Sequence, residues 1–276
     1  MLKVPFIKMV GAGNDFILIS AQPKMDYTKF TKAVCARNTG IGADGVLIFD
    51  KSKTSDFQMR IINADGSEAE MCGNGARCMA AYIVSKHAAA NRLFSMETLA
   101  GQIVAEADGE IARVRLSNPK EYKAGIVLKI NKQTLHASHI DTGVPHAVIF
   151  VEGLSEVDVH SLGRLIRNHD QFKPRGTNAN FVEQTREDLV TVRTYERGVE
   201  DETLACGTGS VAAAIVAYLH VHPKTKNVHE AFMRVLTKSG EILEVTFDIK
   251  NGVEISNVWL KGTAKVIAKG EYCFDA

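Results

Sequence analysis

The sequence is poor in tryptophan and proline and has almost no excess of charge. It contains 1 tryptophan and 6 prolines in 276 residues, and its 33 Lys and Arg side chains nearly balance 32 Asp and Glu. A net charge of +1 leaves no electrostatic excess for nucleic acid or anionic lipid, because such partners demand a basic face. With 45% hydrophobic and 24% charged residues, the composition excludes disordered, collagenous and coiled-coil chains. We expect a small-molecule partner, and neither nucleic acid nor membrane.

No segment of the sequence has the pattern of an export signal or of a membrane span. Lysines and a proline interrupt the apolar residues of positions 1–9, which therefore lack the apolar stretch of a signal peptide. The most apolar window, 204–221, contains Gly207 and Gly209 and falls short of the ~20 apolar residues that a spanning helix needs. An odd count of 5 cysteines does not indicate a disulfide framework in a chain of this length. We expect a cytoplasmic protein.

An internal repeat divides the sequence into two halves. Each copy consists of a β-type segment, an acidic stretch, a Cys-Gly-X-Gly motif and an apolar run. The motif is Cys72-Gly73-Asn74-Gly75 in the first copy and Cys206-Gly207-Thr208-Gly209 in the second. A repeat of this length predicts a duplicated structural unit.

The residues around each motif predict a strand before it and a helix after it. β-Branched and aromatic residues indicate strands at 57–62 and 189–195, and apolar runs at 79–84 and 211–219 predict helices enclosed on all sides. Further short strands are expected at 17–20, 46–49, 103–106, 112–116, 147–151, 179–182, 241–247 and 253–260.

These elements indicate an α+β fold made of two pseudo-symmetric domains. Each domain is expected to wrap a strongly curved β-sheet or barrel around its central apolar helix, with the active site in the cleft between the domains. The turn at Asn118-Pro119 is the expected boundary. The first domain then comprises residues 1–118 with 263–276 and carries Cys72, and the second comprises 119–262 and carries Cys206.

The two repeated cysteines lie where each helix is expected to begin. Free backbone N–H groups and the positive end of the helix dipole favour an anion there, which lowers the pKa of a thiol from its usual ~8.5 toward neutrality. The neighbouring glycines allow the backbone to approach a bound carboxylate. A single motif of this kind is more often a structural turn beside a small buried cysteine. Two copies, each between a predicted strand and a predicted helix, favour a functional role for the two cysteines.

Two thiols on opposite sides of a substrate carbon suit a two-base racemase or epimerase. A thiolate on one side removes a proton and a thiol on the other side returns one, which inverts the stereocentre. The helix N-termini can stabilise the charge that develops on the substrate's α-carboxylate. Cys35, Cys78 and Cys273 have no matched polar setting and are expected to be packing residues. Cys72 and Cys78 form no Cys-X-X-Cys pattern, so no metal site is predicted.

Several motifs along the chain carry a resemblance to a known family. They are Met-Val-Gly-Ala-Gly-Asn-Asp-Phe at 9–16, Gly-Ile-Gly-Ala-Asp-Gly at 40–45, Asn-Ala-Asp-Gly-Ser at 63–67 continuing to Arg77, Gly-Val-Pro-His at 143–146, Gly-Thr-Asn-Ala-Asn-Phe at 176–181, Glu-Arg-Gly at 196–198 and Ala-Cys-Gly-Thr-Gly at 205–209. In this order, and over nearly the whole chain, they resemble the diaminopimelate epimerase family. Its members interconvert LL- and meso-diaminopimelate for the synthesis of lysine and peptidoglycan precursors.

The resemblance implies a role for each matching residue. Cys72 and Cys206 would be the acid/base thiols, and His146 and Glu196 would tune their protonation. The substrate-binding residues would be Asn14, Asn63, Gly73, Asn74, Asn178, Glu196, Arg197, Gly207 and Thr208. Diaminopimelate is zwitterionic at both ends, which suits amides, a carboxylate and a guanidinium. The resemblance also implies an isomerase that needs no pyridoxal phosphate, other cofactor or metal, and a homodimer.

Three positions depart from the family pattern. Val144 stands where many members have a substrate-binding Asn, and Gly45 where some have a Gln. Glu200-Asp201 makes the segment before Cys206 one residue longer than usual. Because these departures bear on specificity, the same mechanism acting on glutamate or proline is an alternative. A non-catalytic amino-acid-binding or redox-sensing protein is a second alternative.

Overall fold

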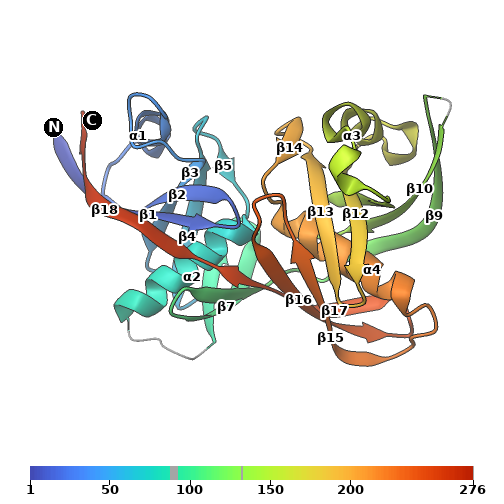
Figure 1. Ribbon diagram of the computed structural model, residues 1–276. Coiled ribbons are helices and arrows are strands. Elements are labelled where there is room, and N and C mark those ends of the chain that lie inside the picture. The colour runs from blue at the N-terminus through green and yellow to red at the C-terminus, as the bar shows by residue number, and fades with distance from the viewer. Residues whose placement is uncertain (88–92, 132, 276) are drawn as a thin grey trace. The chain divides into compact units, whose positions relative to one another are not determined.

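The computed structural model describes residues 1–87, 93–131 and 133–275, which form two compact units (Figure 1). The first unit comprises Met1–Val114 and Lys261–Ala276, and the second comprises Arg115–Leu260. Strands dominate both units and helices are few, which confirms the predicted α+β class. None of the helices in the described part of the chain is long and apolar enough to cross a membrane.

The first unit is a curved mixed sheet with two helices packed against it. Its elements are β1 (Leu2–Gly11), β2 (Asn14–Ser20), α1 (Tyr27–Cys35), β3 (Gly45–Asp50), β4 (Phe57–Asn63), β5 (Glu68–Ala69), α2 (Gly73–His87), β6 (Phe94–Thr98), β7 (Gly101–Asp108), β8 (Ile111–Arg115) and β18 (Lys265–Phe274). Paired neighbours run in the order β18, β1, β2, β3, β4, β6, β7. The β2–β3 and β4–β6 pairs are parallel, and the other pairs are antiparallel.

The second unit repeats this plan. Its elements are β9 (Lys120–Ile130), β10 (Gln133–Asp141), β11 (Pro145–Phe150), η1 (Leu154–Glu156), α3 (Val159–Arg167), η2 (Asp170–Phe172), β12 (Asn178–Arg186), β13 (Leu189–Glu196), β14 (Asp201–Thr203), α4 (Gly207–Val221), β15 (Val228–Leu236), β16 (Ile242–Lys250) and β17 (Glu254–Thr263). Paired neighbours run in the order β9, β10, β11, β12, β13, β15, β16, with β11–β12 and β13–β15 parallel. The matching order and directions show the duplication at the level of topology.

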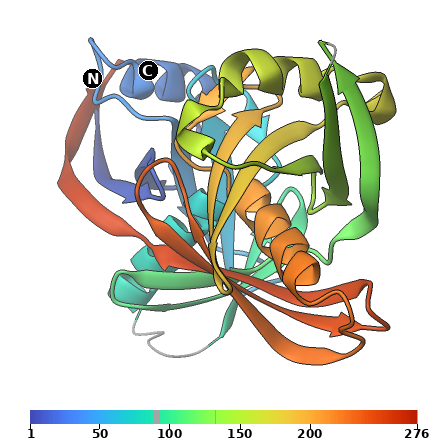
Figure 2. The same cartoon turned by 45° about the vertical axis from the view of Figure 1, so that its right-hand side comes forward.

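The two central helices are buried as the sequence predicts. In α4, every residue from Gly209 to Ala217 is buried, and the helix contacts strands β10 to β13, β15 and β16 (Figure 2). The small alanine side chains of the helix let these strands approach it closely. In an interior packed this densely there is no room for larger side chains. In α2, the residues from Asn74 to Ala81 are buried in the same way. Neither sheet is closed among the described strands, so the expected barrel form is not adopted.

The cysteines outside the repeated motifs differ in their surroundings. Cys35 and Cys78 are buried, which confirms their predicted packing role. Cys273 is exposed, so its predicted packing role is wrong. Neighbouring side chains of a strand point to opposite faces, and in β18 it is Phe274 that reaches the core while Cys273 faces solvent.

Helices α1 and α3 were not predicted from the sequence. Each has 9 residues and begins at an aspartate that caps it: Asp26 accepts from the Lys29 amide, and Asp158 accepts from the Ser161 amide. Such caps typically stabilise a helix by ~1 kcal/mol. In α3 the buried residues are Val159, Gly163 and Ile166, so one face packs on the sheet.

We expect Gly163→Ala to destabilise the second unit strongly. A Cβ at Gly163 would lie 2.3 Å from the Tyr195 Cβ on β13, and Tyr195 is itself buried, so α3 would have to move off the sheet. Overpacking of this kind costs about 1–3 kcal/mol. Urea unfolding measures the loss, with Arg164→Ala on the exposed face of α3 as the control. Equal stability of the two variants would contradict the close packing.

Candidate active site

The first cysteine motif lies at the start of α2 in the first unit. Cys72 is half-buried, and its Sγ accepts a hydrogen bond from the Gly75 amide at 3.5 Å. The next side chain, Asn74, is buried and donates through Nδ2 to Asn14 Oδ1 at 2.6 Å. Arg77 Nη2 donates to Asn74 Oδ1 at 2.9 Å. Both ends of the Asn74 amide are therefore held by the protein.

A charged cluster fixes the orientation of Asn14. Asp44 Oδ2 accepts from Asn14 Nδ2 at 2.9 Å, and Asp44 Oδ1 accepts from Arg37 at 2.7 Å. Because a carboxylate oxygen only accepts, the NH2 end of the Asn14 amide must face Asp44. Asn14 Oδ1 is thus directed to Asn74. The predicted residue Asn63 lies outside this network: it is exposed at the end of β4, and its side chain donates to Ser67 Oγ at 3.0 Å.

The second cysteine motif lies at the start of α4 in the second unit. Cys206 is the N-cap of that helix, and its Sγ accepts from the Gly209 amide at 3.4 Å. Thr208 Oγ1 lies 3.5 Å from the same sulfur. The Glu196 carboxyl also hydrogen-bonds the Cys206 side chain, and its Oε2 accepts from Thr203 Oγ1 at 3.1 Å. Burial raises the pKa of Glu196, which suits a group that takes up the thiol proton.

His146 lies behind the second cysteine motif and is completely buried. Burial lowers its pKa to about 3, so the imidazole is neutral at physiological pH. Its Nε2 lies 3.0 Å from Thr208 Oγ1, and its Nδ1 lies 3.0 Å from Asn180 Nδ2. Thr142 Oγ1 donates to the Thr208 carbonyl at 3.0 Å. The structure thus joins the predicted residues Cys206, Thr208 and His146 through side-chain contacts.

The side chain of Asn178 contacts the backbone of Arg197. Asn178 is buried at the start of β12, and its Oδ1 accepts from the Arg197 amide at 2.6 Å. The Arg197 guanidinium donates through Nη1 to the Arg175 carbonyl at 2.8 Å. Asn178 therefore fixes the chain immediately after Glu196, which is the residue that reaches Cys206.

Comparison with known proteins identifies the family. A model of the diaminopimelate epimerase family matches residues 6–120 and 138–259. The chain belongs to the diaminopimelate epimerase family. It is 40% identical over 279 residues to the diaminopimelate epimerase of Aquifex aeolicus (strain VF5), covering 96% of each chain. It is also 40% identical over 292 residues to that of Methanocella arvoryzae (strain DSM 22066 / NBRC 105507 / MRE50), covering 100% of this chain and 99% of the other.

Solved structures with low sequence identity share the fold. A phenazine biosynthesis protein of the PhzF family from Bacillus anthracis matches with a TM-score of 0.74 at 16% identity, covering 99% of this chain and 100% of the other. A hydroxyproline epimerase from Agrobacterium vitis, with bound trans-4-hydroxy-L-proline, matches with a TM-score of 0.71 at 12% identity, covering 98% and 91%. The duplicated plan described above therefore also occurs outside the diaminopimelate epimerase family.

The longer segment before Cys206 is folded into a tight turn. The Glu200 amide donates to the Glu196 carbonyl at 2.8 Å, and Glu200 takes a positive φ of 60°. Strand β14 then pairs with β13 so that Glu196 lies opposite Asp201 and Thr194 opposite Thr203. This pairing lets Thr203 reach the Glu196 carboxylate, so the extra residue relative to the usual family pattern does not separate Glu196 from Cys206.

The other two departures from the family pattern have separate consequences. A Cβ at Gly45 would lie 2.7 Å from the Ile62 carbonyl oxygen, so the close approach of β3 and β4 requires glycine there. Val144 is half-buried, and its carbonyl accepts from the Thr142 amide at 3.2 Å. Its side chain has no polar atom, so Val144 cannot make the amide contact that the family resemblance implies at this position.

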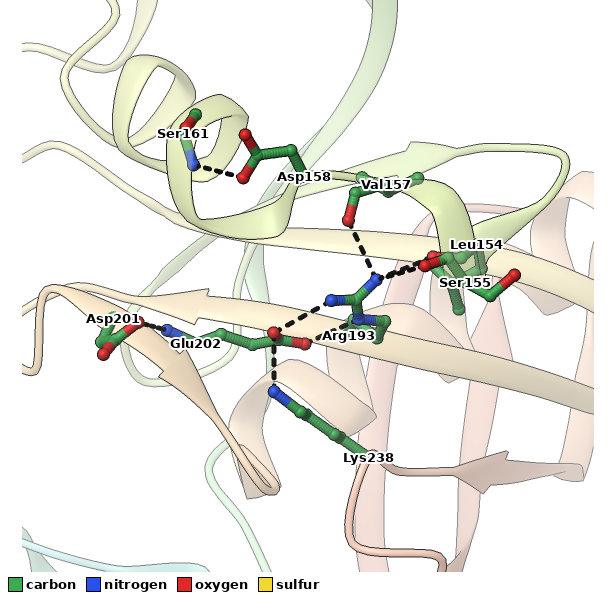
Figure 3. Close-up of polar contacts among 9 residues, drawn as sticks. All are labelled: Leu154, Ser155, Val157, Asp158, Ser161, Arg193, Asp201, Glu202 and Lys238. Carbon is green, nitrogen blue, oxygen red and sulfur yellow. Dashed lines mark hydrogen bonds and ion pairs between the residues drawn. The ribbon is translucent and has the colours of Figure 1, made fainter.

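An ion cluster on β13 and β14 holds the strand that carries Thr203 (Figure 3). Glu202, whose side chain is 10% exposed, accepts from Arg193 Nε at 2.7 Å and Nη2 at 3.0 Å, and from Lys238 at 2.7 Å. Arg193 also donates to the carbonyls of Leu154 and Val157, each at 2.9 Å. The cluster ties β14 to the segment that precedes α3.

We expect Glu202→Gln to lower stability at neutral pH but not in acid. Burial raises the pKa of Glu202, but hydrogen bonds and charges from Arg193 and Lys238 outweigh burial and hold the pKa below its usual range. A carboxyl group whose pKa is depressed stabilises the fold above its unfolded-state pKa, and this contribution is lost as pH falls through the folded-state pKa. At pH 7 the hydrogen bonds between charged groups contribute about 1–3 kcal/mol to the free energy of unfolding. The exposed Lys238 supplies little of this contribution.

Urea unfolding between pH 7 and pH 3 measures this effect. The difference between wild type and Glu202→Gln should shrink below the ordinary Glu pKa of ~4.3. Glu187→Gln, a change at an exposed glutamate of the same unit, is the control and should leave stability unchanged. A stability difference that stays constant with pH would contradict the ionic role of Glu202.

Proposed function

We propose that this chain catalyses the interconversion of LL- and meso-diaminopimelate, without pyridoxal phosphate, in lysine and peptidoglycan precursor synthesis. The observation that carries this proposal is full-length similarity, at about 40% identity, to diaminopimelate epimerases. Two Cys-Gly-X-Gly motifs support it, because each places a thiol at the start of a buried helix. The activity is an isomerisation at one of the two α-carbons of the substrate.

The proposed mechanism moves one proton off the substrate and another onto it. A thiolate, from Cys72 or Cys206 according to the isomer bound, takes the α-proton and becomes a thiol. The electron pair of the broken C–H bond passes toward the α-carboxylate, where backbone N–H groups of 73–74 and 207–208 would stabilise it. The thiol on the opposite face gives its proton to the carbon and becomes the thiolate. The configuration is inverted, and the thiols are left in the protonation state that fits the product isomer. Proton exchange with solvent restores the starting state before the same isomer reacts again.

The groups around Cys206 suit its two protonation states. The Gly209 amide points at the sulfur and favours the thiolate, as do helix N-termini generally. Glu196 hydrogen-bonds the same side chain and has a raised pKa, so it can exchange a proton with the thiol. We assign Asn14, Asn63, Asn178 and Arg197 to the polar groups of the substrate, as the family pattern implies.

Exchange of the α-proton in D2O tests the proposal. The reduced protein, without added cofactor, is incubated separately with LL-diaminopimelate, L-glutamate and L-proline, and loss of the Cα–H signal is followed by NMR. Exchange with inversion of diaminopimelate alone is the expected result. Exchange with glutamate or proline would show that Val144 or the longer turn has changed the specificity. No exchange with any of the three would favour a binding or sensing protein.

The assembly and cellular location of the enzyme are also proposals. We propose a homodimer, as the family resemblance implies, and a cytoplasmic location. Sedimentation equilibrium of the purified protein should give twice the mass of one chain across the micromolar range. A single-chain mass under these conditions would contradict the dimer without affecting the proposed chemistry.

A further inference from the structure

The register of the two sheets shows a chemical difference between the duplicated units. In the first unit, Phe16 on β2 pairs with Gly45, the first residue of β3, and Leu47 pairs with Ile61 on β4. In the second unit the corresponding pairs are His146 with Asn178, the first residue of β12, and Asn180 with Thr194. Three apolar residues, Phe16, Leu47 and Ile61, thus correspond to three polar ones, His146, Asn180 and Thr194.

The glycine of each cysteine motif supports this correspondence. A Cβ at Gly75 would meet the side chains of Leu47 and Phe16, and a Cβ at Gly209 would meet Asn180 Oδ1. The polar residues of the second unit are as buried as their apolar counterparts, with His146 and Asn180 at 0% and Thr194 at 3% exposure. Burial of polar groups is unfavourable unless each is hydrogen-bonded, so the replacement needs a physical reason.

The orientation of the Asn180 amide follows from its partners. Its Nδ2 lies 3.0 Å from the Ala147 carbonyl oxygen, which can only accept. Its Oδ1 accepts from the Thr194 hydroxyl at 3.0 Å. The NH2 end therefore also faces His146 Nδ1, at 3.0 Å, and that nitrogen must be the acceptor. The other ring nitrogen, Nε2, lies 3.5 Å from Asn178 Nδ2, a longer contact than the 3.0 Å contact of Nδ1 with Asn180. Because the buried imidazole is neutral and the shorter contact fixes Nδ1 as the acceptor, its single proton lies on Nε2.

This tautomer sets the direction of the contacts that follow. Nε2–H donates to Thr208 Oγ1 at 3.0 Å, which leaves the Thr208 hydroxyl proton to donate to Cys206 Sγ at 3.5 Å. The Cys206 thiol in turn hydrogen-bonds the Glu196 carboxylate. Every donor in the chain from Asn180 to Glu196 thus points the same way.

We infer that Asn180 is a positioning residue that fixes the tautomer of His146 and thereby places a hydroxyl donor on the sulfur of Cys206. A donor on the sulfur favours the thiolate over the thiol. Behind Cys72 the equivalent positions are apolar, and the neighbouring side chain Asn74 is held by Asn14 and Arg77 instead. The two thiols therefore differ in how their charged forms are stabilised. Only the catalytic use of the Cys206 thiolate rests on the proposed function. The effect of Asn180 on the protonation of Cys206 does not depend on it.

The test replaces Asn180 by the residue found at the equivalent position of the first unit. In Asn180→Leu, Nδ1 of His146 no longer accepts a hydrogen bond from residue 180. The imidazole proton is then no longer confined to Nε2. The 15N shifts of His146 report the tautomer. Thiolate absorbance at 240 nm reports the titration of Cys206, measured in a Cys72→Ser background as the difference from the protein that also carries Cys206→Ser. We expect a mixture of tautomers and a midpoint raised by about one pH unit.

Three further variants separate positioning from packing. Val182→Ala removes buried volume two residues along β12 and should leave both signals unchanged at a comparable loss of stability. Thr208→Ala should raise the Cys206 midpoint as Asn180→Leu does, and Thr208→Ser should restore it. The charged or titratable side chains that act on these groups, Glu196 at Cys206 and both His139 and Arg197 at His146, are retained in every variant.

The outcomes are distinct from those of the activity test, because no substrate is present. An unchanged tautomer and midpoint in Asn180→Leu would overturn the inference, as would an equal shift in Val182→Ala. If Asn180→Leu does not fold, the Thr208 pair decides: the same midpoint for Thr208→Ala and Thr208→Ser would overturn it. A shifted midpoint in a protein that does not exchange diaminopimelate would support the positioning role and contradict the proposed function.

Discussion

Replacement of either Cys72 or Cys206 by alanine is expected to abolish epimerisation of diaminopimelate. In the proposed mechanism each thiol serves one face of the α-carbon, as base for one isomer and as acid for the other, so inversion requires both. Removal of a general acid or base typically costs about 10²–10⁴-fold in rate. In this scheme the two losses are not additive, because either one already prevents inversion.

The two variants should differ in which isomer still exchanges its α-proton with solvent. A variant that retains a thiolate on the correct face can remove the proton and return deuterium to the same face, without inversion. Cys72→Ala and Cys206→Ala should therefore exchange opposite isomers in D2O, and Cys273→Ala, at an exposed position, should behave as wild type. Normal turnover by Cys72→Ala, or exchange of the same isomer by both variants, would contradict the two-base scheme.

The centre of each unit could be predicted from the sequence because its signal is local. A glycine pair followed by an alanine-rich apolar run indicates a buried helix start, and α2 and α4 begin at Gly73 and Gly207. The peripheral elements lack such signals. Strand β18 is exposed over most of its length, so its residues show no alternation of buried and exposed positions, and in β9 such alternation is confined to the second half, from Ile126 to Ile130. Helices α1 and α3 are short. Each is marked in the sequence by a capping aspartate, Asp26 or Asp158, and α3 also by the helical spacing of Val159, Leu162 and Ile166.

The polar chain behind Cys206 could not be predicted because it depends on register. Asn180 and His146 are far apart in sequence, and the parallel pairing of β12 with β11 brings them together. Thr142 and Thr194 were missed for the same reason. One local signal was available: Asn178 and Asn180 recur at a spacing of two in a strand whose other residues through Val182 are apolar and buried. Polar residues on one face of a buried strand indicate a hydrogen-bonded network.

Gly209→Ala and Gly75→Ala should have very different effects although the glycines occupy equivalent positions. A Cβ at Gly209 would lie 2.5 Å from Asn180 Oδ1 and 3.3 Å from Cys206 Sγ. Asn180 cannot yield without breaking its hydrogen bonds to Thr194, Ala147 and His146. We expect a loss of about 1–3 kcal/mol in the free energy of unfolding. Activity should fall about 10²-fold, because small displacements of catalytic groups have effects of this size.

In Gly75→Ala the nearest atom is the end of a flexible side chain, Leu47 Cδ2, at 2.9 Å, and Phe16 Cζ follows at 3.6 Å. Leu47 can rotate at small cost, and alanine gains up to ~1 kcal/mol of helix propensity over glycine. Near-wild-type stability is therefore expected. Urea unfolding and kcat/KM of both variants measure the contrast. Equal losses would mean that the two cysteine motifs have equally rigid surroundings, whereas the expected asymmetry would follow from hydrogen bonds that fix Asn180 and have no counterpart at Leu47.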